Sequence, residues 1–291
     1  MNPSTPPTRR AVLASLAGVV GMAAPDRGRF KDIPFDHVVP RAEEGKAGAG
    51  RRVRQAVDGF ENWDLRHVLY LPAEWKAGGR YPVIVEYPGN GPYRNPLGDV
   101  STGLVEDCRL GFGMGGGKEF IWLCLPFVDP ANKRHARQWW GDPDATAAYC
   151  RQAVARVCGE YGGDPDRVIL CGFSRGAIAC GHIGLRDDAT ARLWRGLVAH
   201  SHYDGVRRWG YADDSPESAM ARLRRLKGRP QWVSHEETVD PARAFLNKAG
   251  VGNTTFMALP WPNHTADWVL KDIPERRQLR DWLGKILTPG R

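Results

Sequence analysis

A serine stands between two glycines at residues 172–176, in a pentapeptide of the form G-x-S-x-G. An apolar run, 168–171, precedes it, and a small-residue pattern typical of a helix begins at Ala177. On such a strand–turn–helix connection the serine lies at the tip of a tight turn, where its hydroxyl is accessible as a nucleophile. The flanking positions need glycine, because a Cβ there would collide with the neighbouring strand or helix. We therefore predict that Ser174 is a nucleophile; the alternative is a glycine-rich turn with an idle serine.

The elements that must position this serine follow from the spacing of apolar residues, Gly and Pro. Strands separated by helices predict the α/β class, with a doubly wound, mostly parallel sheet and helices on both faces. Residues 100–118, with their glycine run, are expected to form a flexible loop or a lid. No repeat or break divides the chain, so residues 51–291 are predicted to be a single domain. The expected strands are 63–71, 81–87, 120–127, 168–171, 196–199, 230–234 and 254–259; the expected helices are 144–161 (capped by Asp142 and Asp144), one from 177, 216–227, 241–249 and 274–286.

These features resemble the α/β-hydrolase superfamily over residues 60–290. The similarity is carried by the order of strands, by PGNG after an early strand, by DPDR before the serine strand and by a late histidine, His264. Within the superfamily the chain looks like secreted esterases of the feruloyl-esterase and polyhydroxyalkanoate-depolymerase type. It departs from the pattern where Pro88-Gly89 replaces the usual His-Gly. The resemblance implies an α/β-hydrolase fold and serine hydrolase chemistry.

A serine hydroxyl is a poor nucleophile near neutral pH and needs a base within hydrogen-bond reach. In this superfamily the chain order is serine, acid, histidine. His264 follows the last predicted strand, where the base belongs, in a loop made rigid by prolines. The alternative for a lone loop histidine is a solvent-exposed or capping role.

The acid must accept a hydrogen bond from histidine Nδ1–H and stabilise the imidazolium that forms during attack. Its usual place is just past strand 230–234, and Glu236 is the carboxylate that we favour there. Glu237 and Asp240 are alternatives, and Asp240 is also a candidate N-cap. Asp204, after the preceding strand, is a further alternative because some members take the acid from that position.

An oxyanion formed in acyl transfer needs prearranged hydrogen-bond donors. The backbone N–H of Arg175, directly after the nucleophile and at a helix N-terminus, is the first expected donor. The second is expected from the loop after the early strand, at Asn90 or Gly91. The alternative is that this loop is simply a turn.

Other polar and aromatic clusters are weaker pointers. His200, His202 and Asp204 could imitate a metal site, but no further ligand of matching spacing is evident, so we predict no metal. Eleven tryptophans are more than usual. Several fall in loops on the same predicted face, where rings beside polar groups suit sugars or phenolic acyl groups: Trp139, Trp140, Trp209 and Trp261, with Tyr211.

Composition limits the partners. The formal net charge is +8, but arginines are scattered through helices and interleaved with acids. No compact basic tract alternates with aromatic residues, so we expect solvated arginine-rich faces and no nucleic-acid partner. The six cysteines contain no C-x-x-C pair. Cys150 and Cys158 lie about 12 Å apart on one predicted helix, too far to bridge. We expect six unpaired thiols or at most one disulfide.

The N-terminus resembles a bacterial twin-arginine export signal, because Arg9-Arg10 precede a weakly apolar run to Ala24. We assign residues 1–27 to this signal and the aperiodic, charged residues 28–50 to a linker. The apolar run is too short for a stable membrane anchor. We therefore expect an exported protein, periplasmic or extracellular; the alternative is a cytosolic protein with an Ala-rich N-terminus.

The residues together predict a serine esterase that works through an acyl-enzyme, without a cofactor, on a small-molecule or polymer-linked ester. A serine peptidase or an acyltransferase on the same fold is the alternative among enzymes. A non-catalytic binding protein with this fold is the alternative outside them. An epoxide or halide hydrolase would need an aspartate where this chain has Ser174.

Overall fold

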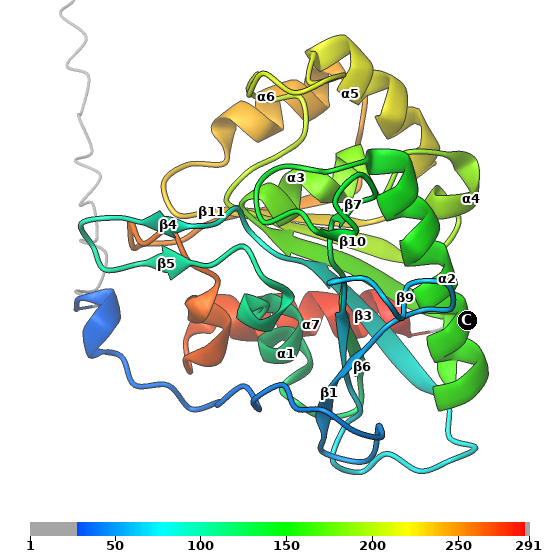
Figure 1. Ribbon diagram of the computed structural model, residues 1–291. Coiled ribbons are helices and arrows are strands. Elements are labelled where there is room, and N and C mark those ends of the chain that lie inside the picture. The colour runs from blue at the N-terminus through cyan, green and yellow to red at the C-terminus, as the bar shows by residue number, and fades with distance from the viewer. Residues whose placement is uncertain (1–27, 289–291) are drawn as a thin grey trace, which may run out of the picture.

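The structure is a computed structural model that describes residues 28–288; the predicted export signal, residues 1–27, lies outside the described residues. At its centre an eight-stranded sheet has the order β1-β2-β6-β3-β9-β10-β11-β12 (Figure 1). β2 pairs antiparallel with β1 and β6, whereas every pair from β6 to β12 is parallel. The strands are β1 Arg52–Gln55, β2 His67–Tyr70, β3 Tyr81–Tyr87, β6 Ile121–Cys124, β9 Gly163–Phe173, β10 Gly196–His200, β11 Gln231–His235 and β12 Thr254–Ala258.

Helices cover both faces of this sheet, which confirms the doubly wound arrangement. The core on one face is built with side chains of α2 (Pro143–Tyr161), α3 (Arg175–His182), α5 (Pro216–Leu223) and α6 (Asp240–Lys248), next to the short α4 (Asp188–Ala191). The core on the other face includes side chains of α1 (Leu110–Gly115) and α7 (Pro274–Leu287). The sheet therefore separates two apolar cores.

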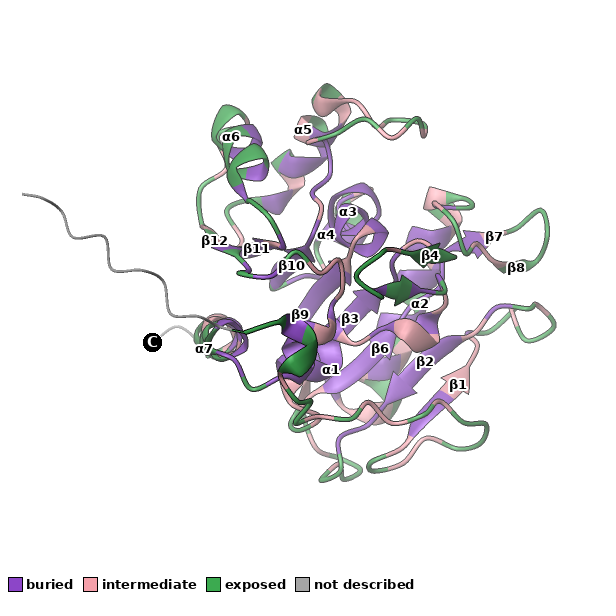
Figure 2. Ribbon diagram, turned by 90° about the vertical axis from the view of Figure 1, so that its left-hand side faces the viewer, coloured by how far each residue is buried: buried purple, intermediate pink, exposed green. Residues whose placement is uncertain are grey.

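β3 shows how the sequence fills both cores. Val83 and Val85 belong to the core under α2 and α3, whereas Ile84 between them belongs to the core under α1 and α7. Successive side chains of a strand point to opposite faces, so a strand covered on both sides must be apolar at consecutive positions. All three side chains are fully buried, and Figure 2 shows the central strands buried along most of their length.

Most predicted elements are present, with shifted boundaries. α2 starts one residue earlier than predicted, and Asp142 is its N-cap because the carboxylate accepts the N–H groups of the next two non-proline residues. The predicted strand 63–71 shrinks to β2, and the predicted helix 216–227 ends as α5 at Leu223. β1 was not predicted, because its sequence RVRQ alternates arginine with single apolar or polar residues.

Residues 100–118, expected to be a flexible loop or a lid, contain the packed helix α1. The carboxylate of Glu86 accepts the N–H groups at the start of this helix, from Arg109, Leu110 and Gly111, at 2.8–3.1 Å. A Cβ on Gly111 would lie 2.5 Å from the Trp122 ring. The glycines therefore permit a close approach of helix to sheet, which their sequence alone does not distinguish from flexibility.

Residues 28–50, expected to be a linker, lie against the folded body as an irregular segment (blue in Figure 1). Phe30 is buried, and the Lys271 ammonium lies 4.6 Å from its ring and 4.0 Å from that of Phe35. Glu43 forms a β-bridge with Val53. Single side chains of this aperiodic segment therefore pack against the folded body. Within residues 28–288, none of the helices has the length and hydropathy needed to cross a bilayer.

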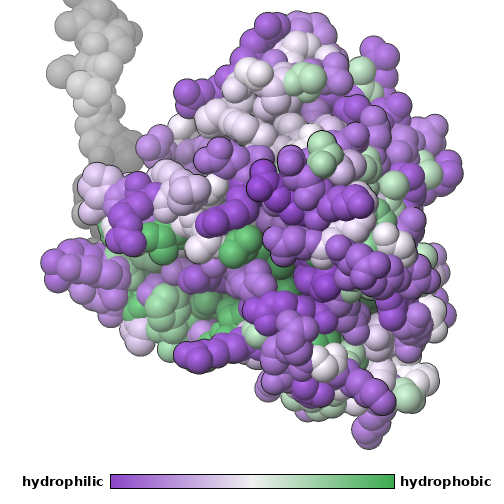
Figure 3. Space-filling view, viewed as in Figure 1, coloured by the Kyte–Doolittle hydropathy of each residue, from purple (hydrophilic) through white to green (hydrophobic). Residues whose placement is uncertain are grey.

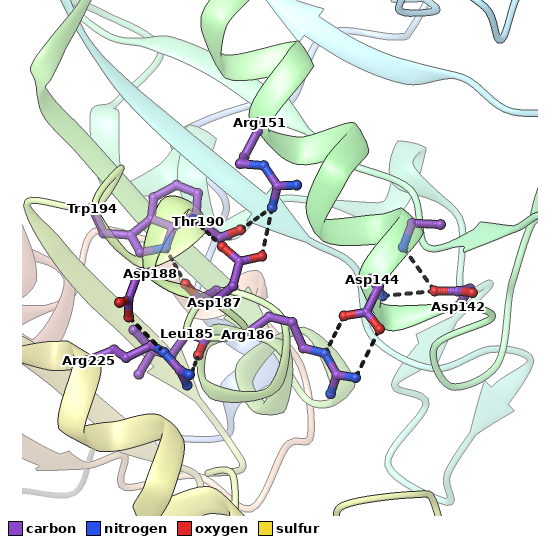
Figure 4. A network of polar contacts seen from close by, with 12 residues as sticks. Asp142, Asp144, Arg151, Leu185, Arg186, Asp187, Asp188, Thr190, Trp194 and Arg225 are labelled. Carbon is purple, nitrogen blue, oxygen red and sulfur yellow. Dashed lines mark hydrogen bonds and ion pairs between the residues drawn. The ribbon is translucent and has the colours of Figure 1, made fainter.

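Arginines on the described surface pair with acids, as the interleaved charges suggest. Figure 4 shows three such pairs around the N-terminal half of α2 and the segment that carries α4. Surface pairs of this kind typically contribute about 0–1 kcal/mol each, so they matter more for local geometry than for total stability. The pairs are Arg151–Asp187 at 2.9 Å, Arg186–Asp144 at 2.7 Å and Arg225–Asp188 at 3.0 Å.

The turn between β9 and α3 is the tightest point of the fold. Ser174 has φ 55° and ψ −117°, a strained conformation for a residue with a side chain. A Cβ on Gly172 would lie 2.1 Å from the carbonyl oxygen of Gly176, and a Cβ on Gly176 would lie 2.0 Å from that of Tyr87. The requirement for glycine on both sides of the serine is therefore confirmed, and the obstacle is backbone.

We predict that Gly176→Ala lowers the free energy of unfolding by about 3 kcal/mol or more, because overpacking against backbone cannot relax through a side-chain rotation. The matched control is Gly159→Ala in α2, where an added Cβ meets nothing within 4 Å. That change should raise stability by roughly 0.5–1 kcal/mol, because alanine is the better helix former. Urea unfolding of the two variants tests both signs, and equal stabilities would contradict the steric argument.

Candidate active site

Ser174 and His264 meet at the C-terminal edge of the parallel strands. Ser174 ends the β9 turn, and His264 lies in the loop after β12. The serine Oγ is 3.1 Å from His264 Nε2, although the residues are 90 positions apart. This distance is within hydrogen-bond reach, so the imidazole can take the hydroxyl proton.

Glu236 follows β11 and contacts the other side of the same imidazole. Its Oε1 accepts the hydrogen bond from His264 Nδ1. Burial of Glu236 opposes ionisation, but the hydrogen bond with His264 and the charges of nearby imidazoles hold the pKa of this carboxyl below its usual value. An ionised carboxylate in this position fixes the histidine tautomer that leaves Nε2 free to accept a proton.

The three alternative acids lie elsewhere or face solvent. Asp204 is buried in a paired contact with Arg222, at 2.9 and 3.0 Å. Glu237 and Asp240 are both exposed, and Asp240 is the first residue of α6 with no capping hydrogen bond from its side chain. The carboxylate nearest the strand end, Glu236, is thus the one that the fold brings to His264.

Ser201 is a member of this cluster that the sequence reasoning missed. It is fully buried and has φ 82°, a strained value for a residue other than glycine. Its Oγ donates to Glu236 Oε1 at 2.8 Å and lies 2.9 Å from His264 Nδ1. Its position at the end of β10, within the polar run 200–204, was the available clue. The hydroxyl helps to fix the carboxylate against the imidazole.

Aromatic rings hold the imidazole of His264 on several sides. Ring centroids lie 4.8 Å away for Phe173, 5.2 Å for Tyr93 and 5.4 Å for His202. Phe173 directly precedes the serine, and Tyr93 comes from a hairpin between β3 and α1. The imidazole is therefore confined by packing as well as by hydrogen bonds.

The expected oxyanion donors have different environments. Arg175 is the first residue of α3, so its N–H has no acceptor within the helix. The N–H of Gly91 already donates to the carbonyl of Arg137 at 3.0 Å. Of the two alternatives in that loop, Asn90 keeps an N–H without an acceptor in the part of the chain that the structure describes. Its side-chain Oδ1 accepts the N–H of Trp139 at 2.8 Å, which fixes the loop.

The side chain of Arg175 ties the surrounding loops together. It is 1% exposed and lies 4.0 Å from the Phe127 ring. Its guanidinium donates to four backbone carbonyls, and it forms no ion pair with a carboxylate among residues 28–288. Because such a buried charge needs hydrogen-bond acceptors, the loops cannot move away without a large cost. The acceptors are the carbonyls of Gly89 (2.8 Å), Gly103 (3.3 Å), Ala136 (2.9 Å) and Trp139 (2.7 Å).

Two histidines lie at the C-terminal end of β10: His200 is its last residue, and His202 follows two residues later. His200 Nε2 donates to the carbonyl of Thr265 at 3.0 Å, and Nδ1 contacts the Ser234 hydroxyl at 3.1 Å. Burial lowers the pKa of His200 and of His202 to about 4 each, so both rings are neutral near pH 7. Both His200 nitrogens and Asp204 are therefore engaged with protein groups.

One group of ligand-type side chains does gather elsewhere among the described residues. Glu86, Cys108 and Cys124 have their ligand atoms within 4.8 Å of one another. The Glu86 oxygens, however, accept three backbone N–H groups and the Trp122 indole N–H at 2.9 Å. This carboxylate therefore serves the start of α1. All six cysteines are described, and all are free thiols.

The aromatic residues gather in part as predicted. Trp139 contacts Trp209 and Tyr211 at 5.8 and 5.4 Å between ring centroids. Trp261 does not join them: it packs on Phe30 at 5.7 Å, because its loop turns toward the N-terminal segment. Beside the cluster, a cavity of about 300 Å³ opens between the ends of β10 and β11, and its lining includes His202, Trp209 and Glu236.

Solved structures share this fold over about four fifths of the chain. Thermogutta terrifontis esterase 2 phosphorylated by paraoxon has a TM-score of 0.54 and 15% identity, over 81% of this chain and 93% of that one. A thermostable esterase has a TM-score of 0.50 and 14% identity, over 80% of this chain and 62% of that one. Porphyromonas gingivalis dipeptidyl peptidase 4 has a TM-score of 0.53 and 12% identity, over 82% and 36%.

At such low identities the likeness shows the fold alone. The chain spans less than two thirds of the thermostable esterase and about a third of the peptidase. No family model and no curated protein sequence matches this chain.

The neutral state of buried His200 predicts a loss of stability in acid. Its pKa is about 4 in the folded state against about 6.5 unfolded, so the unfolded chain binds the extra proton between these values. The free energy of unfolding then falls as pH drops from about 6.5 to 4, by up to roughly 3 kcal/mol for this group.

His200→Gln keeps a donor for the Thr265 carbonyl but cannot titrate. Urea unfolding at pH 7 and pH 4.5 should therefore show a smaller acid-induced loss in the variant than in the unmodified protein. An identical loss would mean that His200 is not protonated on unfolding.

Proposed function

We propose that this chain, which has the α/β-hydrolase fold, is a serine hydrolase that cleaves carboxylic esters through an acyl-enzyme. The observation that carries the proposal is the hydrogen-bonded series Ser174 Oγ, His264 and Glu236, with 3.1 Å between the serine Oγ and His264 Nε2. A hydroxyl, a base and an orienting carboxylate in this order form the minimal apparatus for nucleophilic catalysis.

In the proposed reaction Ser174 Oγ attacks the ester carbonyl carbon while its proton passes to His264 Nε2. The carbonyl oxygen becomes an oxyanion, which the N–H groups of Arg175 and Asn90 stabilise. Glu236 stabilises the imidazolium without taking the proton. When the tetrahedral intermediate collapses, the bond to the alcohol oxygen breaks, and the alcohol leaves with the proton from His264.

Water then completes the cycle. His264 takes a proton from the water molecule as its oxygen attacks the acyl carbon, and a second oxyanion forms in the same place. Collapse breaks the bond to Ser174 Oγ, which regains the proton from His264, and the carboxylic acid leaves. No cofactor enters any of these steps.

The substrate that we propose is an ester with a sizeable apolar or polymeric part. The hairpin of β4 (Tyr93–Arg94) and β5 (Val100–Ser101) exposes Tyr93, Leu97 and Val100, which are 37%, 53% and 50% exposed. Figure 3 shows apolar residues gathered below this hairpin. Because Tyr93 touches His264, the exposed apolar edge begins at the reacting groups. The cluster of Trp139, Trp209 and Tyr211 additionally suits a sugar or phenolic group.

A serine peptidase is the second candidate, because dipeptidyl peptidase 4 of Porphyromonas gingivalis shares the fold. Cleavage of an amide uses the same nucleophile, but the leaving amine must receive a proton before the C–N bond breaks. Parallel assays with matched ester and amide substrates therefore distinguish an esterase from a peptidase.

An acyltransferase would pass the acyl group to an added alcohol in preference to water. Export through a twin-arginine signal is part of the proposal and rests on the N-terminal sequence alone.

Ser174→Ala should lower the hydrolysis of p-nitrophenyl butyrate by at least about 10³-fold, and His264→Ala should have a comparable effect, because the two residues act as a unit. Ser218→Ala, at a half-buried serine in α5, is the control and should keep full activity. Equal rates for Ser174→Ala and the unmodified protein would favour a non-catalytic binding protein.

The double variant Leu97→Ser/Val100→Ser tests the apolar edge. Loss of two apolar contacts of about 1 kcal/mol each should raise KM for long-chain p-nitrophenyl esters roughly tenfold or more. KM for the acetate ester should stay unchanged, because we expect a two-carbon acyl group to be too short to reach Leu97 and Val100. Val38→Ser, at an 83% exposed valine of the N-terminal segment, is the control. A uniform effect on all chain lengths would argue against contact with the substrate.

A further inference from the structure

The turn of the β4–β5 hairpin holds a buried carboxylate, that of Asp99. Asn95 Oδ1 accepts the backbone N–H groups of Leu97 and Asp99, both at 3.0 Å. These bonds form a compact turn that holds Asp99 inward, where the residue is only 8% exposed. Figure 1 shows the hairpin beside the orange segment, which carries His264. The turn therefore directs the Asp99 carboxylate toward that segment.

The carboxylate of Asp99 bridges the hairpin and the histidine loop. Its Oδ2 accepts the backbone N–H of His264 at 2.9 Å, and its Oδ1 accepts the side-chain amide of Asn263 at 2.9 Å. Asn95 Nδ2 also donates to Oδ2, at 2.7 Å. Among the described residues no cationic side chain pairs with this carboxylate, so its charge is stabilised by N–H donors alone.

The hydrogen bond from the His264 N–H to Asp99 restrains the residue whose imidazole must face both Ser174 and Glu236. The side chain of His264 is confined by Glu236 and by aromatic rings, but its backbone lies in a loop after the edge strand β12. A bond to the backbone N–H fixes the point from which the imidazole projects. A displacement of about 1 Å between reacting groups can cost roughly 10²-fold in rate.

We propose that Asp99 is a positioning residue for His264, which anchors the base-bearing loop to the hairpin over the site. This inference rests on the proposed role of His264 as general base. The same hairpin presents Leu97 and Val100 to the substrate side, so one element carries both an apolar contact surface and the anchor of the base.

Asp99→Asn is the sharpest test, because it keeps the shape and replaces one acceptor oxygen by a donor. With its NH₂ group toward His264, the new amide opposes a donor with a donor. With its NH₂ group toward Asn263, whose own amide can turn to accept, the oxygen still faces the N–H of His264, but the hydrogen bond loses the negative charge that strengthens it. We expect kcat for p-nitrophenyl butyrate to fall about 10- to 100-fold, with KM within about 3-fold, because the base acts in the chemical steps.

The matched control is Asp107→Asn. Asp107 also accepts a backbone N–H from the chain just after the hairpin, that of Thr102, but it has no contact with residues 263–264. This variant should keep kcat within about 2-fold of the unmodified protein. If Asp99→Asn fails to fold, Asn263→Ala, which removes one arm of the bridge, takes its place with an expected several-fold loss of kcat.

A readout that needs no turnover separates this proposal from the proposed function. The proton between His264 Nδ1 and Glu236 should give a low-field proton NMR resonance, assigned by its absence in His264→Ala. In Asp99→Asn, or in Asn263→Ala if that variant is used, we expect this resonance to shift or broaden; in Asp107→Asn it should stay. A retained resonance or an unchanged kcat in the bridge variant overturns the positioning role. Absence of ester hydrolysis in the unmodified protein would instead refute the function and leave the NMR test of the anchor standing.

Discussion

The backbone passes through the turn at Ser174 with almost no free space around it. β9, α3 and the end of β3 approach so closely that only glycine fits at 172 and 176. The N–H of Ser174 donates to the carbonyl of His200 at the end of the neighbouring strand, which holds the strained residue in place. The tight turn fixes the backbone from which the Ser174 side chain projects toward His264.

The buried guanidinium of Arg175 extends this constraint to the loops. Its positive charge is stabilised by carbonyl dipoles of the segments 89–103 and 136–139, with no carboxylate to neutralise it among the described residues. A charge in this environment favours negative charge nearby, and the expected oxyanion would form beside the N–H of the same residue. Arg175 thus has a backbone N–H that is free of acceptors within α3 and a side chain that fixes the loops around the site.

The imidazole of His264 is held by contacts from four separate parts of the chain. Glu236 and Ser201 act on Nδ1, Phe173 packs beside the ring, and the hairpin contributes Tyr93 and the anchor Asp99. Each contact restrains a different degree of freedom, which suits an imidazole that must face both a hydroxyl and a carboxylate. The α/β-hydrolase sheet supplies this convergence, because the carboxyl ends of its parallel strands meet at one edge.

The sequence by itself determined the sheet class, the serine turn and the candidates Ser174, His264 and Glu236, because these depend on local patterns and on chain order. It left the acid open among Glu236, Glu237, Asp240 and Asp204, since carboxylates near a strand end look alike until burial and direction are known. The packed glycines of α1, the anchored N-terminal segment, and the contacts of Ser201 and Asp99 were decided only by tertiary structure. The contacts of Ser201 and Asp99 join residues 35 and 165 positions apart. The glycines of α1 and the N-terminal segment depend on close approaches between elements. None of these features produces a periodic pattern in the sequence.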